Sequence, residues 1–187
     1  MDKKYIAYHE AGHAVLQYRF HLYNIGASIV EDNDSLGRAM RLYEDIDICC
    51  IDPETKEEVV KIDLESIRKN MMVKYAGRAA ETILNPKRKP TGYWGDYQRA
   101  KELNELAGNV FNQRKLIFET RKMLKENWKQ VEAIANELLA LNELNDDEVE
   151  LIIDAIDKGR DYKTDLKGYR NFMHALRNDT ERKTEDK

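Results

Sequence analysis

Two histidines and a glutamate lie within five residues near the start of the sequence. The segment His9-Glu10-Ala11-Gly12-His13 has the pattern His-Glu-x-x-His. In a helix the two imidazoles, four residues apart, lie on one face and can bind one zinc ion. Glu10 would then lie beside the metal, where a carboxylate can take a proton from a water molecule that the metal activates. The pentapeptide therefore predicts two metal ligands and the general base of a zinc hydrolase.

The alternative interpretation is that these are ordinary helix residues. His9 and His13 would then be surface or core histidines, and Glu10 a solvated charge. Two observations favour the metal site. Half of the four histidines in the chain fall within the motif, and an apolar helix would keep their imidazoles dry and fixed. The mostly apolar flanks are Tyr5, Ile6, Ala7, Ala14, Val15 and Tyr18.

Composition predicts one helix-rich domain. The 187 residues can bury a substantial core, 35% of them are charged, and the net charge of −4 gives no reason to expect a nucleic-acid partner. No apolar run approaches the length of a membrane-spanning helix, and no signal-peptide core follows Met1, so we expect no membrane span. The adjacent Cys49 and Cys50 are expected to be reduced thiols, which indicates a cytoplasmic protein.

The elements that must position the motif follow from periodicity. A first helix is expected over 4–22, and short β-like runs separated by turn residues then predict a small, mostly antiparallel sheet within 25–62. Helical periodicity returns from Asp63. The predicted fold is therefore α+β and mostly α-helical, with a His-Glu-x-x-His helix and a small sheet followed by a helical bundle.

The second half of the chain is expected to be helical after a loop. The loop runs from 85 to 96, and helices are expected over 97–115, 117–142 and 146–158. Asn145 and Glu148 have the spacing of a capping box for the last of these. We expect a zinc peptidase domain over 1–158 and a charged, partly disordered tail over 159–187.

A catalytic zinc usually has three protein ligands, so a third must be found. The extended metzincin pattern would place Gly at 16 and His at 19, but the chain has Leu16 and Arg19, which excludes that class. His21 lies too far along the first helix to share the metal, and His174 lies in the charged tail.

Two carboxylates remain as candidates for the third ligand. Glu81 lies in a helix that can pack beside the first one. Asp96 stands at the end of the loop, immediately before a helix, where its ordinary role would be an N-cap that accepts backbone N–H bonds. One carboxylate could serve both needs, with one oxygen on a backbone amide and the other on zinc.

Three ordered motifs resemble the FtsH-type zinc metalloproteases (peptidase family M41). They are Ala7 to Ala14 around the two histidines, Gly77-Arg78-Ala79-Ala80-Glu81, and Thr91-Gly92 with Asp96 four residues on. Weaker similarity extends to Ser35 to Met40, which looks like the strand beside the active site, and to Trp128 through Ile153. The resemblance covers about residues 5–155.

The resemblance implies a specific site. His9, His13 and Asp96 would bind Zn²⁺, Glu10 would be the general base, and Glu81 would support the site without binding metal. The strand with Leu36, Gly37, Arg38, Ala39 and Met40 would pair its backbone with an extended substrate. The activity implied is zinc-dependent endopeptidase cleavage of unfolded or extended polypeptides, and the assembly implied is a homo-oligomer.

The chain also departs from that family. Gly95 replaces the Asn that usually precedes the ligand Asp, and bulky Tyr93 and Trp94 replace smaller residues. No Gly-x-x-x-x-Gly-Lys-Ser/Thr phosphate loop occurs, so we expect a protease domain without an ATPase module, which a separate ATPase partner could supply with substrate. The alternative function is a non-catalytic metallo-fold that serves as an oligomerising or partner-binding module. Nothing in the sequence specifically supports a non-protein amide as the substrate.

Overall fold

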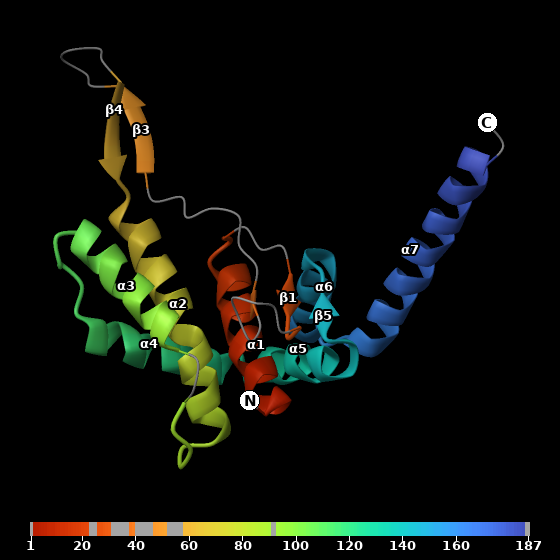
Figure 1. Ribbon diagram of the computed structural model, residues 1–187, viewed down its shortest axis with the longest axis horizontal. Coiled ribbons are helices and arrows are strands. Elements are labelled where there is room, and N and C mark those ends of the chain that lie inside the picture. Colours follow the sequence, from red (N-terminus) through yellow and green to blue (C-terminus); the bar gives the residue numbers. More distant parts are fainter. Residues whose placement is uncertain are drawn as a thin grey trace.

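The first helix, α1 (Lys3–Arg19), lies at the centre of the protein, between the α2–α4 side and the α5–α6 side (Figure 1). The computed structural model describes residues 2–22, 26–30, 38–39, 47–51, 58–90 and 93–185. Asp2 caps α1 by accepting a hydrogen bond from the backbone N–H of Lys4. Every residue from Ile6 to Gln17 is buried, so the helix is enclosed on all faces. The first helix expected over 4–22 is present, but it ends at Arg19, and His21 takes a positive φ angle of 55°.

Helix α2 (Leu64–Leu84) packs directly against α1. A Cβ added at Gly12 of α1 would lie 2.9 Å from the carbonyl oxygen of Ala76 and 2.9 Å from Cβ of Ala80. Only glycine allows so close an approach of the two backbones. This contact brings the middle of α2 opposite the two histidines of the motif.

Helices α3 (Trp94–Leu106) and α4 (Gln113–Glu126) cover the other side of α2. They form a second apolar core with it, made of Ile67, Met71, Met72, Tyr75, Ala100, Leu103, Ala107 and Leu116. The predicted helix over 97–115 is wrong. Gly108 and Asn109 take positive φ angles of 70° and 60°, which end one helix, and Asn112 caps the next.

Helices α5 (Trp128–Leu141) and α6 (Asp146–Asp157) complete the larger core around α1. The predicted helix over 117–142 is divided at Asn127, which ends α4 and precedes α5. The predicted capping box is confirmed: Asn145 accepts from the backbone N–H of Glu148, and the Glu148 carboxylate accepts from that of Asn145.

The strands form two small antiparallel sheets where a single sheet was expected. Strand β1 (Ala27–Ser28) pairs with β2 (Arg38–Ala39) and with β5 (Glu143–Leu144), in the order β2-β1-β5. Strands β3 (Asp47–Ile51) and β4 (Glu58–Ile62) form a separate hairpin that leads into α2 (Figure 1). The α+β, mostly helical fold class is confirmed.

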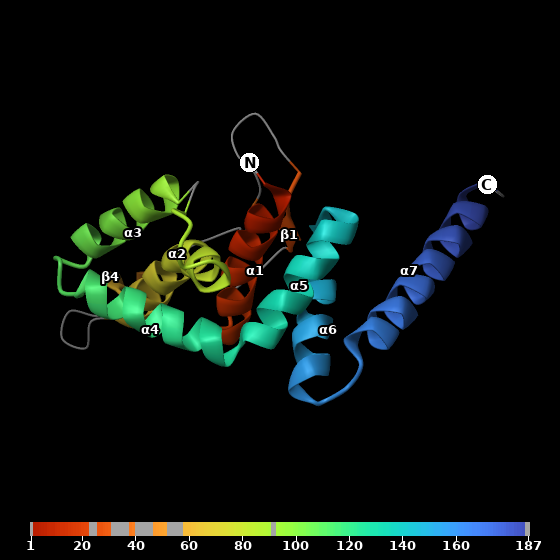
Figure 2. The same ribbon diagram turned by 90° about the horizontal axis from the view of Figure 1, so that it is seen from below.

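The charged segment at the end of the sequence is helical. Helix α7 (Tyr162–Glu185) begins on the main core, where Leu166 is buried, and then extends away from the other helices (Figure 2). Tyr169 donates to Asp147, and Arg170 pairs with Glu148 and Glu137. These contacts join the first turns of α7 to α5 and α6, within the segment 159–187 that was predicted to be a charged, partly disordered tail.

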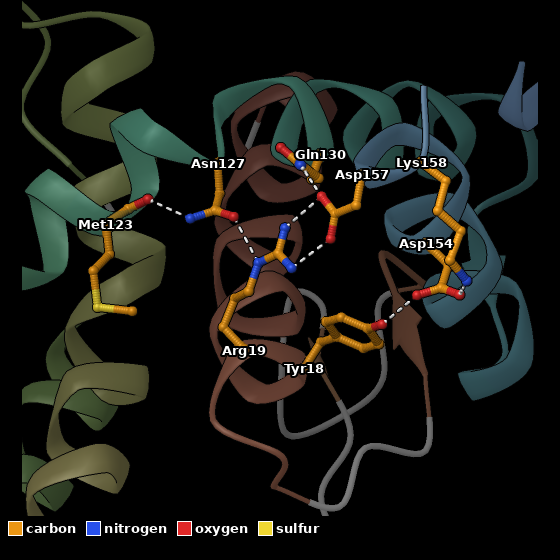
Figure 3. Close-up of polar contacts among 8 residues, drawn as sticks. All are labelled: Tyr18, Arg19, Met123, Asn127, Gln130, Asp154, Asp157 and Lys158. Atoms are coloured by element: carbon orange, nitrogen blue, oxygen red, sulfur yellow. Dashed lines mark hydrogen bonds and ion pairs between the residues drawn. The ribbon is translucent and has the colours of Figure 1, made fainter. Parts of the chain in front are cut away.

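A polar network fixes the end of α1 against α5 and α6 (Figure 3). Arg19 binds both carboxylate oxygens of Asp157, at 2.5 and 2.7 Å, and donates to Asn127 Oδ1 at 2.6 Å. Tyr18 donates to Asp154 at 2.6 Å. Burial and that hydrogen bond raise the pKa of Tyr18 to about 12. The network holds the helix that carries the motif at three points.

No helix in the ranges that the structure describes is long and apolar enough to cross a membrane.

Candidate metal centre

The two histidines of the motif lie side by side in the interface between α1 and α2. His9 is 8% exposed and His13 is 6% exposed, and their ring centroids are 4.8 Å apart. Their spacing of four residues puts both rings on the face of α1 that packs against α2. The helical arrangement expected from the motif is therefore present.

Each imidazole is oriented by a hydrogen bond from its Nδ1 to α2. His13 Nδ1 lies 2.7 Å from the carbonyl oxygen of Val73, and because a carbonyl can only accept, Nδ1 carries the hydrogen. His9 Nδ1 lies 2.7 Å from Glu81 Oε1, where a carboxylate likewise accepts. Both bonds leave Nε2 as the nitrogen that can bind a metal, which is the usual arrangement of metal-binding histidines.

Asp96 brings the third donor atom to the same point. Its Oδ2 lies 3.1 Å from His13 Nε2 and 3.3 Å from His9 Nε2. The ligand atoms of His9, His13 and Asp96 all lie within 4.8 Å of one another. Two imidazole nitrogens and one carboxylate oxygen in this arrangement form a group that can hold a metal ion.

The expected N-cap role of Asp96 is wrong. Helix α3 begins at Trp94, its N-cap is Tyr93, and no side chain caps it. Asp96 therefore lies in the first turn, where the helix dipole favours a negative charge. Its second oxygen, Oδ1, lies 3.6 Å from Nζ of Lys74. The carboxylate is thus directed entirely at the histidines and at a cation of α2.

The electrostatics of the group favour bound cations. Burial alone would lower the pKa of His9, but its hydrogen bonds to Asp96 and Glu81 and the charge of Glu10 outweigh burial and raise that pKa to about 10. Burial would raise the pKa of Asp96, but His13, His9 and Lys74 hold it well below its usual range. A metal ion would compete with a proton for His9, as expected for a carboxylate-rich site.

Glu10, the predicted general base, is buried beside this group. It is 6% exposed, and its charge is one of the causes that raise the pKa of His9. Its position in the sequence, directly after His9, places its Cα about 100° around the helix from that ligand.

Gly77 makes the space in which the two imidazoles meet. A Cβ at this position would lie 2.3 Å from His9 Nε2 and 2.6 Å from His13 Nε2. Any other residue would therefore collide with both rings. The sequence alone predicted no role for Gly77, although a glycine inside a helical pattern is a signal of close approach.

The roles of Lys74 and of the Val73 carbonyl were also not predicted, because the sequence carries no local signal for either.

The predicted substrate strand is described only in part. Arg38 and Ala39 form β2, whose partners in β1 are Ser28 and Ala27, and β2 stands at one end of the three described strands of its sheet. Leu36, Gly37 and Met40 lie outside the described residues. His21 and His174 are not part of the metal-binding group.

No model of a known protein family matches the sequence, and no curated protein matches it. The resemblance to FtsH-type proteases therefore rests on the three motifs. Two of them supply the metal-binding group (His9, His13 and Asp96), and the other supplies Glu81, which accepts from His9.

Proposed function

We propose that the protein is a zinc-dependent endopeptidase of the FtsH type. The observation that carries the proposal is the convergence of His9, His13 and Asp96, whose ligand atoms all lie within 4.8 Å of one another. The other ring nitrogen of each histidine is already bound to α2.

The donor set fits zinc in a catalytic role. Catalytic zinc sites commonly have three protein ligands of the histidine and carboxylate type, which leaves a position open for water or substrate. Zinc bound here would act as a Lewis acid and would make a water molecule acidic near neutral pH. The buried surroundings of His9 and His13 limit competition from bulk water.

The chain's own residues would carry the proton steps. Glu10 would take a proton from the water molecule whose oxygen attacks the scissile carbonyl carbon. Glu10 would then give that proton to the leaving amine as the C–N bond breaks. Glu81 and the carbonyl of Val73 would keep the rings of His9 and His13 in the tautomer that presents Nε2 to the metal.

The substrates proposed are unfolded or extended polypeptides. Strand β2 (Arg38–Ala39) stands at one end of the three described strands of its sheet, and such an edge can add an extended chain by backbone pairing. Pairing of this kind tolerates many side chains, so the cleavage would be broad in sequence.

Metal content and casein hydrolysis together test the proposal. The wild type should bind one zinc per chain and hydrolyse casein, and a chelator should stop the hydrolysis. His13→Ala should lose both zinc and activity. A wild type that binds zinc but does not hydrolyse casein would favour the non-catalytic, partner-binding alternative.

A further inference from the structure

Helix α2 contacts every member of the candidate metal-binding group. Glu81 accepts from His9 Nδ1 at 2.7 Å, and the Val73 carbonyl accepts from His13 Nδ1 at 2.7 Å. The third contact is made by Lys74, whose Nζ lies 3.6 Å from Asp96 Oδ1. Each ligand thus presents one atom to the metal position and has its other polar atom engaged by α2.

We propose that Lys74 is a positioning residue that engages Oδ1 of Asp96, so that only Oδ2 is free to bind the metal. The proposal rests on the metal site proposed above. A carboxylate can bind a metal through one oxygen or through both. If both oxygens of Asp96 bound, they would fill the position that a catalytic site leaves open for water. The ammonium group of Lys74 prevents this by occupying the second oxygen.

The surroundings of this ion pair distinguish it from an ordinary surface pair. The side chains of Lys74 and Asp96 are only 24% and 21% exposed. Asp96 is not the N-cap of α3, because that position is held by Tyr93. By contrast, Lys101 and Glu105 on the exposed face of α3 form an i,i+4 pair in which both side chains are more than half exposed. Pairs of that kind contribute little.

Because Lys74 is positively charged, its removal should affect zinc affinity and turnover differently. Removing a cation from beside a divalent metal does not weaken the attraction of the metal for its ligands. Lys74→Met also releases a second carboxylate oxygen toward the metal. Zinc should therefore bind as tightly as before or more tightly, while turnover falls. A lysine with a merely structural role would instead lower zinc affinity when removed, because the site would lose its shape.

The test compares the full chain with Lys74→Met, Lys74→Arg and the control Lys101→Met. Lys74→Met should keep the zinc dissociation constant at or below that of the wild type and should lower casein turnover about 10–100-fold. When Co²⁺ replaces zinc, the visible absorption of the Lys74→Met variant should be weaker than that of the wild type. The reason is that a higher coordination number makes the bands of Co²⁺ less intense. Lys74→Arg, whose guanidinium can engage the same oxygen, should restore most of the spectrum and the turnover. Lys101→Met should match the wild type throughout.

Two results would overturn the inference: a Co²⁺ spectrum unchanged by Lys74→Met, or zinc binding weakened by that substitution. Failure of the proposed function would look different. A wild type that binds Co²⁺ but hydrolyses no casein would refute the peptidase assignment, while the spectra of the variants would still decide the role of Lys74. A wild type that binds no metal would refute both proposals.

Discussion

Substitution of Gly77 by alanine is the sharpest structural test of how the metal-binding group is assembled. The added Cβ would lie 2.3 Å from His9 Nε2, 2.4 Å from His9 Cδ2 and 2.6 Å from His13 Nε2. Non-bonded heavy atoms normally approach to about 3.5 Å, so the overlap is roughly 1 Å on both rings at once. Neither ring can turn away without losing its hydrogen bond to Glu81 or to Val73.

The backbone cannot relieve this overlap easily. Helices α1 and α2 already touch at Gly12, where an added Cβ would lie 2.9 Å from both Ala76 O and Ala80 Cβ. Overpacking of this kind costs about 1–3 kcal/mol of stability. In a helix interior, alanine stabilises the helix by up to about 1 kcal/mol relative to glycine. The net change expected for Gly77→Ala is therefore a loss of about 0–2 kcal/mol, together with displaced Nε2 atoms.

Gly168→Ala is the matched control, because Gly168 also lies in a helix and has no atom within 4 Å of the added Cβ. It keeps the gain in helix propensity without the overlap, so the two variants should differ by about 1–3 kcal/mol. Urea denaturation without metal measures this difference, and zinc titration should show affinity about 10–100-fold weaker in Gly77→Ala. Equal stability and equal zinc affinity in the two variants would refute the described packing of the rings.

Three further predictions concern the groups that orient the site and the helices around it. Glu81→Ala removes the acceptor of His9 Nδ1 and should weaken zinc binding about 10–100-fold in a titration; unchanged affinity would contradict its orienting role. Asn145→Ala removes half of a capping box and should lower the free energy of unfolding by about 1 kcal/mol in urea, whereas a loss near zero would mean that the cap is not formed. The Arg19 hydrogen bond and ion pair lower the pKa of Asp157, so their stabilisation is present above the ordinary value of 3.8 and is lost as the pH falls through the lowered pKa. The stability difference between the wild type and Asp157→Asn should therefore shrink below about pH 4, and a difference that grows there would reverse the assigned sign.

Local signals in the sequence predicted the features that depend on local chemistry. The pair Asn145 and Glu148 needs only its own helix end to form a capping box, and the structure has it. The spacing of His9 and His13 likewise depends only on α1 being helical. For Asp96 the sequence offered two roles, an N-cap and a metal ligand. Helix α3 begins two residues before Asp96, so Asp96 is not the N-cap, and its carboxylate is directed at His9, His13 and Lys74.

Features that depend on distant parts of the chain could not be predicted in this way. Strand β5 (Glu143–Leu144) is two residues long and exists because it pairs with β1, more than a hundred residues earlier. The ordered start of α7 depends on the bonds of Arg170 to Glu148 and Glu137. The contact of Lys74 with Asp96 follows from the packing of α2 against α3, and no sequence pattern in either helix predicts this contact.

We propose Glu10 as the general base of a metal centre formed by His9, His13 and Asp96. The most direct test is Glu10→Gln, which removes the base and keeps the size of the side chain. Zinc content and casein hydrolysis should be measured on the same preparation of this variant and of the wild type. The account predicts one zinc per chain in both proteins and hydrolysis by the wild type alone. A Glu10→Gln variant that keeps its zinc and hydrolyses casein at the wild-type rate would contradict it.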